Sequence, residues 1–386
     1  MTPAARISAA IDVLDRWFSG APVEQVLTNW GRMNRYAGSG DRRAIRDLVY
    51  DALRRRRSYG WLGGADSGRG LMLGALRAAG TDPAPLFTGR DHAPPPLDNE
   101  TGLPLDDAPE AVRLDCPDWL FEEFARSGFD GRAVLNCFQR RAPVFLRVNL
   151  AKITRDDAIG ILAGQGISAR LHPLAATVLE VTDGARSVAA SDAYRDGLIE
   201  LQDAASQAVV DALGVTPGLR ALDFCAGGGG KALALAAQGA SVTAHDANPG
   251  RMRDIAPRAA RAGVRIDVLK ALPKGLWPLV VVDAPCSGTG TWSRDPETKW
   301  RLTPERMDQI CDLQAEIINQ AAKNVAAGGR LAWITCSLLP RENAEIVSDF
   351  IKRNNGFQLE ANRSLTPLDG GDGFSVSILK RNDSLM

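Results

Sequence analysis

Two segments of the sequence contain residues that can do covalent chemistry. VVVDAPCSG carries Asp283 and Cys286 after a run of apolar residues, and AWITCS carries Cys336 after another. Each reads as a strand of a parallel sheet followed by a loop, and ligands bind at the carboxyl ends of such strands. We therefore expect two thiols and a carboxylate around one pocket.

This set of groups suits methylation of cytosine at carbon 5. Carbon 5 is too weakly nucleophilic to take a methyl group from a sulfonium until a thiolate adds to carbon 6; a base then removes the carbon-5 proton and the thiol leaves. Asp283 would orient the ring through N3 and the exocyclic amine. A single cysteine at the end of a strand is more often an unreactive residue of the core, so the prediction depends on the presence of two cysteines. The residues alone leave open whether Cys286 or Cys336 attacks.

A glycine-rich turn precedes both segments and predicts a cofactor site. The strand LRALDF runs into a loop that opens a helix and comprises Cys225, Ala226, Gly227, Gly228, Gly229, Gly230 and Lys231. Backbone N–H groups of such a loop approach a polar ligand closely, although a tight turn without a ligand is the alternative. Asp246 ends the next strand, where a carboxylate accepts hydrogen bonds from ribose hydroxyls, and Asp267 is expected to end the third strand and address an adenine. The loop lacks the Walker pattern of phosphate-binding proteins.

With these motifs the chain resembles the bacterial ribosomal RNA cytosine-5 methyltransferases of the Nol/Nop/Sun (Fmu, RsmB-like) family over nearly all of its length. The family's cofactor loop is matched between Asp223 and Lys231, its Asp-Ala-Pro-Cys-Ser-Gly motif by Asp283–Gly288, its Thr-Cys-Ser motif by Thr335–Ser337 and its Gln-Asp-x-Ala-Ser-Gln motif by Gln202–Gln207.

The resemblance implies S-adenosylmethionine as the cofactor, Cys336 as the nucleophile and Cys286 as the thiol that assists release of the methylated RNA. It also implies that four residues line the cofactor or substrate pocket, namely Lys231, Asp246, Asp267 and Asp283. Two positions depart from the family, because Gly228 replaces a proline and Ala232 replaces a threonine. Glycine loosens the loop, but the lysine and the three acidic residues are kept, so we expect an active enzyme.

The fold expected from the pattern and the resemblance is α/β: a Rossmann-like methyltransferase core with a seven-stranded mixed sheet, an N-terminal all-helical NusB-like domain and a small α/β subdomain between them. The expected domains are 1–90 (helical, RNA-binding), 91–115 (acidic, proline-rich linker), 116–200 (small α/β, RNA-binding) and 201–386 (catalytic). Strands of the core are predicted at 219–226, 241–247, 264–269, 279–285, 330–337 and 373–379.

Charge is distributed unevenly although the formal net charge is zero. Residues 1–60 hold eleven arginines against six acidic residues, and Arg42, Arg43, Arg46 and the run Arg54–Arg57 predict a phosphate-contacting helix, with a solvated charged face as the alternative. By resemblance, the stretch around Arg147 and Asn149 helps to form an RNA groove. The expected partner is RNA, namely 16S ribosomal RNA, with transfer RNA as the alternative substrate.

Other classes of protein fit less well. Six cysteines without a Cys-x-x-Cys pair and three histidines argue against disulfides and a metal site.

The absence of a long apolar run and of a signal peptide predicts a cytoplasmic protein without a membrane partner, which we expect to be a monomer. A nicotinamide-dependent oxidoreductase has no use for two such cysteines, and an amino-group methyltransferase would carry Asn/Asp-Pro-Pro-Tyr/Phe. A non-catalytic RNA-binding or assembly factor remains as the alternative from another class.

Overall fold

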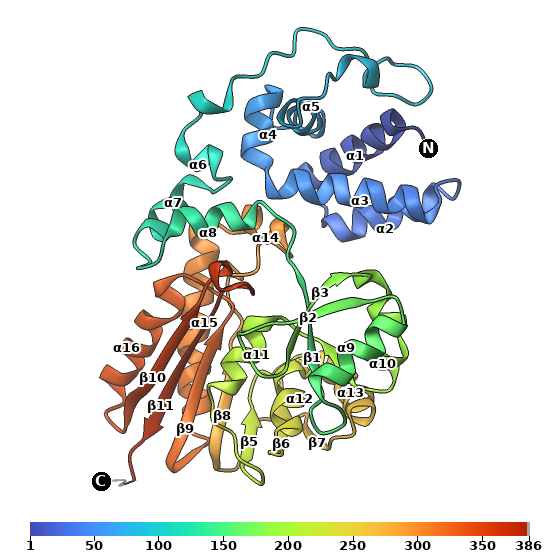
Figure 1. Ribbon diagram of the computed structural model, residues 1–386. Coiled ribbons are helices and arrows are strands. Elements are labelled where there is room, and N and C mark those ends of the chain that lie inside the picture. Colours follow the sequence, from blue (N-terminus) through green and yellow to red (C-terminus); the bar gives the residue numbers. More distant parts are fainter. Residues whose placement is uncertain (384–386) are drawn as a thin grey trace. The chain divides into compact units, whose positions relative to one another are not determined.

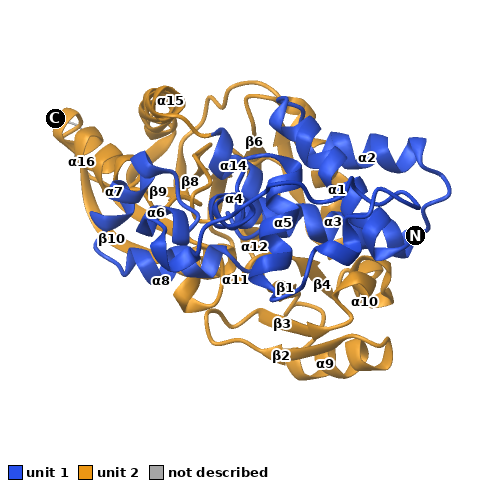
Figure 2. Ribbon diagram, turned by 90° about the horizontal axis from the view of Figure 1, so that it is seen from above, with its two compact units in different colours: residues 1–141, 292–301 blue, residues 142–291, 302–386 orange. Residues whose placement is uncertain are grey.

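The computed structural model describes residues 1–383 and divides into two compact units. The first comprises Met1–Arg141 with Trp292–Arg301, and the second comprises Ala142–Thr291 with the chain from Leu302 onward (Figure 2). The division therefore follows Arg141 rather than the predicted linker. A short segment of the sequence expected to be catalytic, 292–301, belongs to the helical unit.

The second unit is built on the predicted seven-stranded mixed sheet (Figure 1). Its order is β10-β11-β9-β8-β5-β6-β7, in which β11 is antiparallel to both neighbours and β9, β8, β5, β6 and β7 pair in parallel. The strands are β5 (Arg220–Asp223), β6 (Ser241–His245), β7 (Ile266–Leu269), β8 (Trp277–Asp283), β9 (Val325–Thr335), β10 (Phe357–Leu365) and β11 (Phe374–Arg381). Of these, β10 was not predicted, because most of its side chains are exposed and it shows no apolar run.

Helices cover both faces of this sheet, as the apolar strands require. They are α11 (Ala204–Asp211), α12 (Gly230–Ala237), α13 (Ile255–Ala262), α15 (Pro304–Ala322) and α16 (Ala344–Arg353). Successive residues of a strand point to opposite faces. Accordingly Ala221 and Val281 pack with α11, α12 and α13, whereas Leu222 and Val280 pack with α15 and α16.

A smaller antiparallel sheet of order β2-β3-β1-β4 precedes the large one in the same unit. Its elements are β1 (Val144–Val148), α9 (Arg155–Gly164), β2 (Ser168–Leu171), β3 (Val178–Asp183), α10 (Asp192–Arg195) and β4 (Ile199–Leu201). The apolar runs predicted β1 and β3, while β2 and β4 are too short and too polar to show a period. Thr154 caps α9 by accepting a hydrogen bond from Asp157 N.

The first unit is all-helical. Its helices are α1 (Pro3–Phe18), α2 (Val23–Met33), α3 (Ser39–Arg54), α4 (Arg56–Gly63), α5 (Gly68–Ala78), α6 (Glu110–Arg113), α7 (Asp118–Ala125), α8 (Gly131–Phe138) and α14 (Pro296–Arg301). Residues 91–115, predicted to be a solvated linker, instead contact this unit, since Glu100 pairs with Arg69 and Pro104 O accepts a hydrogen bond from the Trp61 indole at 3.0 Å. No helix within 1–383 is long and apolar enough to cross a membrane.

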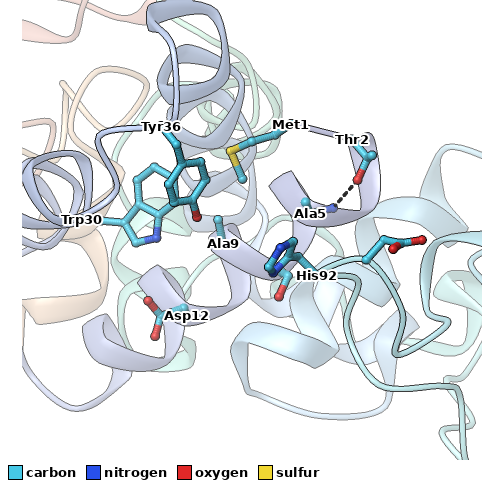
Figure 3. A pocket seen from close by; sticks show the side chains of 10 residues that line it. Met1, Thr2, Ala5, Ala9, Asp12, Trp30, Tyr36 and His92 are labelled. Atoms are coloured by element: carbon cyan, nitrogen blue, oxygen red, sulfur yellow. Dashed lines mark hydrogen bonds between the residues drawn. The ribbon is translucent and has the colours of Figure 1, made fainter.

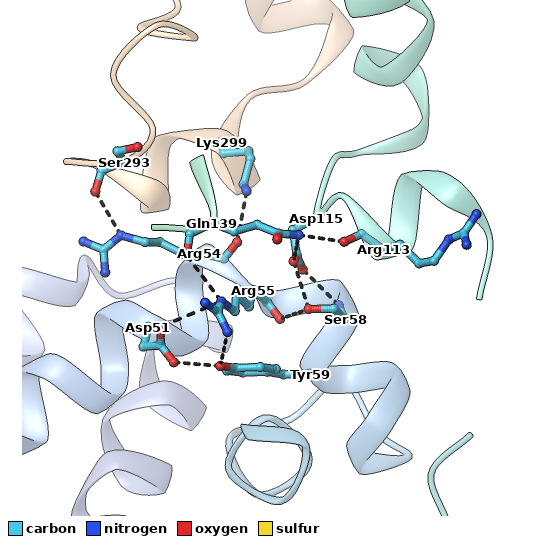
Figure 4. Close-up of polar contacts among 10 residues, drawn as sticks. All are labelled: Asp51, Arg54, Arg55, Ser58, Tyr59, Arg113, Asp115, Gln139, Ser293 and Lys299. Carbon is cyan, nitrogen blue, oxygen red and sulfur yellow. Dashed lines mark hydrogen bonds and ion pairs between the residues drawn. The ribbon is translucent and has the colours of Figure 1, made fainter. Parts of the chain in front are cut away.

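The run Arg54–Arg57 is a structural anchor, so its prediction as a phosphate-contacting surface is wrong. Arg54 is 8% exposed and its Nε donates to Ser293 O at 2.9 Å, and Arg57 pairs with Asp118 at 2.7 Å (Figure 4 shows the surroundings of Arg54). The sequence pattern could not reveal this because the partners of these arginines, Ser293 and Asp118, come from distant parts of the chain.

Segment 292–301 is fixed by buried side chains within the helical unit. Trp292 packs against Phe124 and Phe138, with ring centroids 5.4 Å apart in each pair. The ammonium of Lys299, which is 1% exposed, donates to Arg54 O at 3.2 Å (Figure 4), and burial lowers the pKa of Lys299 to about 8.

Candidate active site

The two candidate cysteines lie side by side at the carboxyl ends of adjacent parallel strands. Cys286 follows β8 and Cys336 follows β9, and the strands are in a register that pairs Asp283 with Ile334. The Sγ atoms of Cys286 and Cys336 are 3.3 Å apart, and both residues are half-buried. The structure thus brings together the two thiols that the sequence singled out.

The two thiols share a hydrogen bond that either of them can donate. This hydrogen bond and burial raise the pKa of Cys286 well above its ordinary value. The pair can act together in covalent catalysis, and the resemblance to the family implies that Cys336 is the nucleophile.

The carboxylate of Asp283, at the end of β8, pairs with the ammonium of Lys231. Their Oδ2 and Nζ atoms are 2.7 Å apart, and the Lys231 side chain is 6% exposed. Lys231 Nζ also lies 5.0 Å from the centre of the Phe374 ring. Asp283 keeps 37% of its side chain exposed, so it both neutralises a buried cation and remains accessible to a ligand.

Asp223 at the end of β5 is buried without a hydrogen-bond partner in the described residues. Its exposure is 1%, and neither carboxylate oxygen has a hydrogen-bond partner. Burial, reinforced by the nearby Asp283, raises the pKa of Asp223 to about 7. A buried carboxyl without a partner is costly, and one beside a glycine loop marks a position where a ligand donor fits.

The glycine loop adopts the tight geometry expected of a cofactor loop. Gly227 and Gly229 have φ of 49° and 80°, and a Cβ on Gly229 would come within 2.7 Å of Ile255. Gly228 stands where the family has proline, and its backbone is not in the left-handed conformation. Arg258 donates a hydrogen bond to the carbonyl of Gly228. Arg258 therefore restrains this position of the loop.

The remaining loop residues lie between the end of β5 and the first turn of α12. Ala226 N donates to His245 O at 2.8 Å, which ties the loop to β6. Cys225 is half-buried, and burial raises its pKa, so it is not a reactive thiol. Gly230 begins α12, and Ala232 is fully buried in the core beside it.

Asp246 follows β6 and holds the loop. Its Oδ2 accepts from Gly227 N at 2.9 Å and pairs with Arg251 at 3.3 Å, and its Oδ1 accepts from Asn248 N at 2.9 Å. The carboxylate lies where the sequence placed it, at the end of the second strand. A carboxylate oxygen has more than one lone pair, so Asp246 can still accept a hydroxyl hydrogen bond if the 60% exposed Arg251 side chain moves.

Asp267 is not at the end of β7, so the prediction that it ends the third strand is wrong, while its contact with an adenine stays a prediction. It is the second residue of β7, it stands opposite Thr243, and its side chain is 61% exposed beside Arg265. The strand continues for two residues beyond it. The polar character of the residue suggested a turn, but β7 is an edge strand, where a polar side chain inside the strand faces water.

Sequence reasoning missed Glu342, which joins the loops that carry the two cysteines. This carboxylate is fully buried; its Oε1 accepts from Ser287 N at 2.8 Å and from Gln314 Nε2 at 3.0 Å, and its Oε2 accepts from the hydroxyls of Ser287 and Ser337. Ser287 follows Cys286 and Ser337 follows Cys336. Glu342 thus fixes both cysteines through the residues next to them, a role that no local motif signals.

Replacing Glu342 with glutamine should therefore loosen both loops together. We expect Glu342→Gln to lower the free energy of unfolding by about 1–3 kcal/mol, because an amide replaces one acceptor oxygen with a donor. Misplacement of the thiols should lower methyl transfer by about ten- to hundredfold. Urea unfolding and turnover assays measure the two effects, with the exposed Glu345→Gln as the control. Wild-type behaviour of Glu342→Gln would show that the carboxylate does not position the loops.

Arg147 and Asn149 are buried and connect the small sheet to the rest of the unit, so the prediction that this stretch helps to form an RNA groove stays a prediction. Both are 7% exposed. Arg147 donates to Gly230 O at 3.0 Å and to Gln202, and burial lowers the pKa of Arg147 to about 10. Asn149 donates to Ala262 O at 2.8 Å. Their hydrogen bonds connect the small sheet to the glycine loop and to α13.

The residues present fit S-adenosylmethionine. A cationic ligand suits the unpartnered carboxyl of Asp223 and the partly exposed Asp283, and the carboxylate of Asp246 could accept hydrogen bonds from ribose hydroxyls. Within 1–383 no cluster of histidine, cysteine, aspartate and glutamate side chains could hold a metal ion.

Comparison with protein families gives two matches. Residues 210–380 match the family described as 16S rRNA methyltransferase RsmB/F, and residues 116–188 match an RsmF/B-like ferredoxin-like domain. Among solved structures, the chain is similar to PH0851, with a TM-score of 0.77, 21% identity and 99% of each chain covered. NSun6 from Pyrococcus horikoshii, solved with SFG, has a TM-score of 0.60, 18% identity and covers 70% of this chain and 99% of its own. These structures have the same fold.

Similar sequences include proteins named ribosomal RNA small subunit methyltransferase B. The one from Cronobacter sakazakii is 32% identical over 67% of this chain, and the match spans 64% of the relative's length. The one from Thermus thermophilus is 32% identical over 72% of this chain and 68% of the relative. With its matched domains and this degree of identity, the chain belongs to the RsmB/F family of methyltransferases.

Proposed function

We propose that this protein transfers a methyl group from S-adenosylmethionine to carbon 5 of a cytosine in 16S ribosomal RNA. The observation that carries the proposal is the 3.3 Å approach of Cys286 and Cys336 beside the Lys231–Asp283 pair. Two thiols and a carboxylate at adjoining strand ends match a reaction that needs a nucleophile, a second group that assists its departure and a group to orient the ring.

Cys336 is the nucleophile in this proposal. Its thiolate adds to carbon 6 of the cytosine, which raises the electron density at carbon 5. Carbon 5 takes the methyl group, a base removes the proton from carbon 5, and the bond between Cys336 and carbon 6 breaks. Cys286, whose sulfur lies 3.3 Å from that of Cys336, assists the departure of Cys336.

Asp283 and Lys231 orient the target base. The exposed part of the Asp283 carboxylate accepts a hydrogen bond from the exocyclic amine of cytosine, and Lys231 keeps Asp283 in place through their 2.7 Å ion pair. The base reaches this position only from a loop or after it has left its stack, since a thiolate cannot add to a stacked and paired ring.

S-adenosylmethionine supplies the electrophilic methyl group when it is bound. The chain's own contribution is to hold it: Asp223 and the glycine loop take its amino-acid end, and Asp246 takes the ribose. The structural relative solved with SFG, an analogue of this cofactor, supports the assignment. The names of the Cronobacter and Thermus relatives support small-subunit ribosomal RNA as the substrate.

The test is to trap the covalent intermediate. We expect Cys286→Ala protein, mixed with S-adenosylmethionine and unmethylated 16S ribosomal RNA, to form a protein–RNA adduct that survives denaturation, because the step that releases Cys336 is impaired. The double variant Cys286→Ala/Cys336→Ala should form none. Adduct and methylated product are measured by gel shift and by mapping of the RNA.

Each contrary result has a distinct meaning. An adduct that persists in the double variant would remove Cys336 as the nucleophile. An adduct with transfer RNA but not with 16S ribosomal RNA would change the substrate class. A wild-type protein that binds RNA but neither binds the cofactor nor methylates would be a non-catalytic RNA-binding factor.

A further inference from the structure

The helical unit contains a cavity that the proposed chemistry does not use. Its volume is about 560 Å³, and it lies among α1, the turn after α2 and the loop at Asp91 and His92. Trp30 and Tyr36 lie on one side of it and His92 on another (Figure 3). Tyr36 is 73% exposed, so a face of its ring is available to a ligand.

Two carboxylates face this cavity. Asp12 reaches it from α1, where it also pairs with Arg16 at 3.2 Å, and Asp91 reaches it from the loop. Asp91 and His92 both have left-handed backbone conformations, with φ of 50° and 66°. A left-handed conformation at two successive non-glycine residues costs energy and is kept where the surroundings require it, often at binding sites.

A surface rich in arginine adjoins the cavity. Its members are exposed and lie on α2, on the following turn and on α3: Arg32, Arg35, Arg42, Arg43 and Arg46. A second hollow of about 330 Å³ is lined by three of them, and Trp30 lines both hollows. Within residues 1–383 no hydrogen bond or ion pair is made by the side chains of Arg32, Arg35 or Arg43.

We propose that this cavity and its arginines bind one guanine nucleotide of a single-stranded RNA segment. The base enters the cavity and stacks on Tyr36, while the phosphates of the same strand lie on Arg32, Arg35 and Arg43. Stacking on an exposed aromatic ring beside a cationic surface is the way in which single-stranded nucleic acids are held.

The carboxylates make guanine the base of choice. Guanine presents two adjacent donors, its ring N1–H and its exocyclic amine, which one carboxylate can accept together. Adenine presents its amine beside an acceptor nitrogen, which a carboxylate repels, and Asp12 and Asp91 offer only acceptors when ionised. A basic peptide is disfavoured, because the arginines of the adjoining surface would repel it.

This inference rests on the proposal that the substrate is RNA and adds a second contact outside the catalytic site. The experiment measures binding of full-length protein to labelled single-stranded decamers that differ only in a central G, A or C, at several salt concentrations. The variants are Tyr36→Ala, Tyr36→Phe, Asp91→Asn and Arg35→Gln/Arg43→Gln. Arg126→Gln, which changes an exposed arginine of the same unit, is the matched control.

We expect wild type to prefer the G decamer. Tyr36→Ala should weaken its binding by about tenfold or more, because stacking is lost, whereas Tyr36→Phe keeps the ring and retains binding. Asp91→Asn should remove the preference for G. The double arginine variant should weaken the binding of all decamers alike, and it should reduce the salt dependence of the affinity by the amount expected for about two phosphate contacts. Arg126→Gln should bind like wild type.

Equal binding of all decamers by wild type and Tyr36→Ala would overturn the inference, as would binding of an oligolysine peptide that competes with the G decamer. Methyl transfer by the same preparations separates this result from the proposed function. Wild type that methylates ribosomal RNA while Tyr36→Ala binds normally would refute only the nucleotide site. Loss of binding in Tyr36→Ala without any methyl transfer by wild type would refute only the catalytic proposal.

Discussion

Cys336→Ala is expected to lower methyl transfer by about four orders of magnitude or more, because removal of a covalent nucleophile leaves only binding and positioning. Cys336 is half-buried and makes its side-chain contact with the thiol of Cys286, so the substitution should leave the fold and the glycine loop intact. Binding of S-adenosylmethionine should therefore stay within about twofold of wild type. Single-turnover methyl transfer and equilibrium cofactor binding measure the two quantities.

The control is Cys137→Ala, which removes another half-buried thiol at a distance in the sequence from both motifs. This variant should methylate at the wild-type rate. If Cys336→Ala kept substantial activity while Cys286→Ala lost it, the attacking thiol would be Cys286, as in the DNA cytosine-5 methyltransferases. If both single variants stayed active, covalent catalysis by this pair would be refuted.

Asp223→Asn is expected to stabilise the protein above neutral pH. The pKa of Asp223 rises from 3.8 to about 7 because the carboxyl is buried and stands near Asp283. Between these two values the folded chain binds one more proton than the unfolded chain, so the free energy of unfolding falls as pH rises through this window. The loss amounts to about 4 kcal/mol at most, and asparagine, which does not ionise, avoids it.

Urea unfolding of wild type and Asp223→Asn between pH 4 and pH 9 tests this expectation. The two curves should converge at the acid end and separate as the pH approaches 7. Asp267→Asn, which changes an exposed carboxylate of the same sheet, should follow wild type throughout. Parallel curves for wild type and Asp223→Asn would mean that Asp223 is ionised in the folded protein at all these pH values.

The same carboxyl couples stability to cofactor binding. An ionised Asp223 attracts a cationic ligand, so the affinity of wild type for S-adenosylmethionine should rise with pH through about 7, whereas Asp223→Asn should bind weakly at every pH. A variant that is more stable but binds worse is the signature of a buried group kept for function. Titration calorimetry at three pH values measures this change.

The sequence by itself determined the reactive groups and most of the strands that carry them. Asp283, Cys286 and Cys336 stand out because each follows an uninterrupted apolar run, and a strand buried on both faces must be apolar throughout. The carboxyl ends of neighbouring parallel strands meet at one edge of a sheet. The proximity of the two thiols therefore follows from local pattern together with sheet topology.

Only the tertiary structure decided which charged side chains are structural. Arg54–Arg57 were predicted to contact phosphates but make contacts within the helical unit. Asp267 was predicted to end a strand but lies inside an edge strand. Glu342 belongs to no motif, although it hydrogen-bonds to the loops that carry both cysteines. The physical reason is that the role of a charged group depends on its burial and on partners from distant parts of the chain. These are properties of the packed molecule, and no local pattern encodes them.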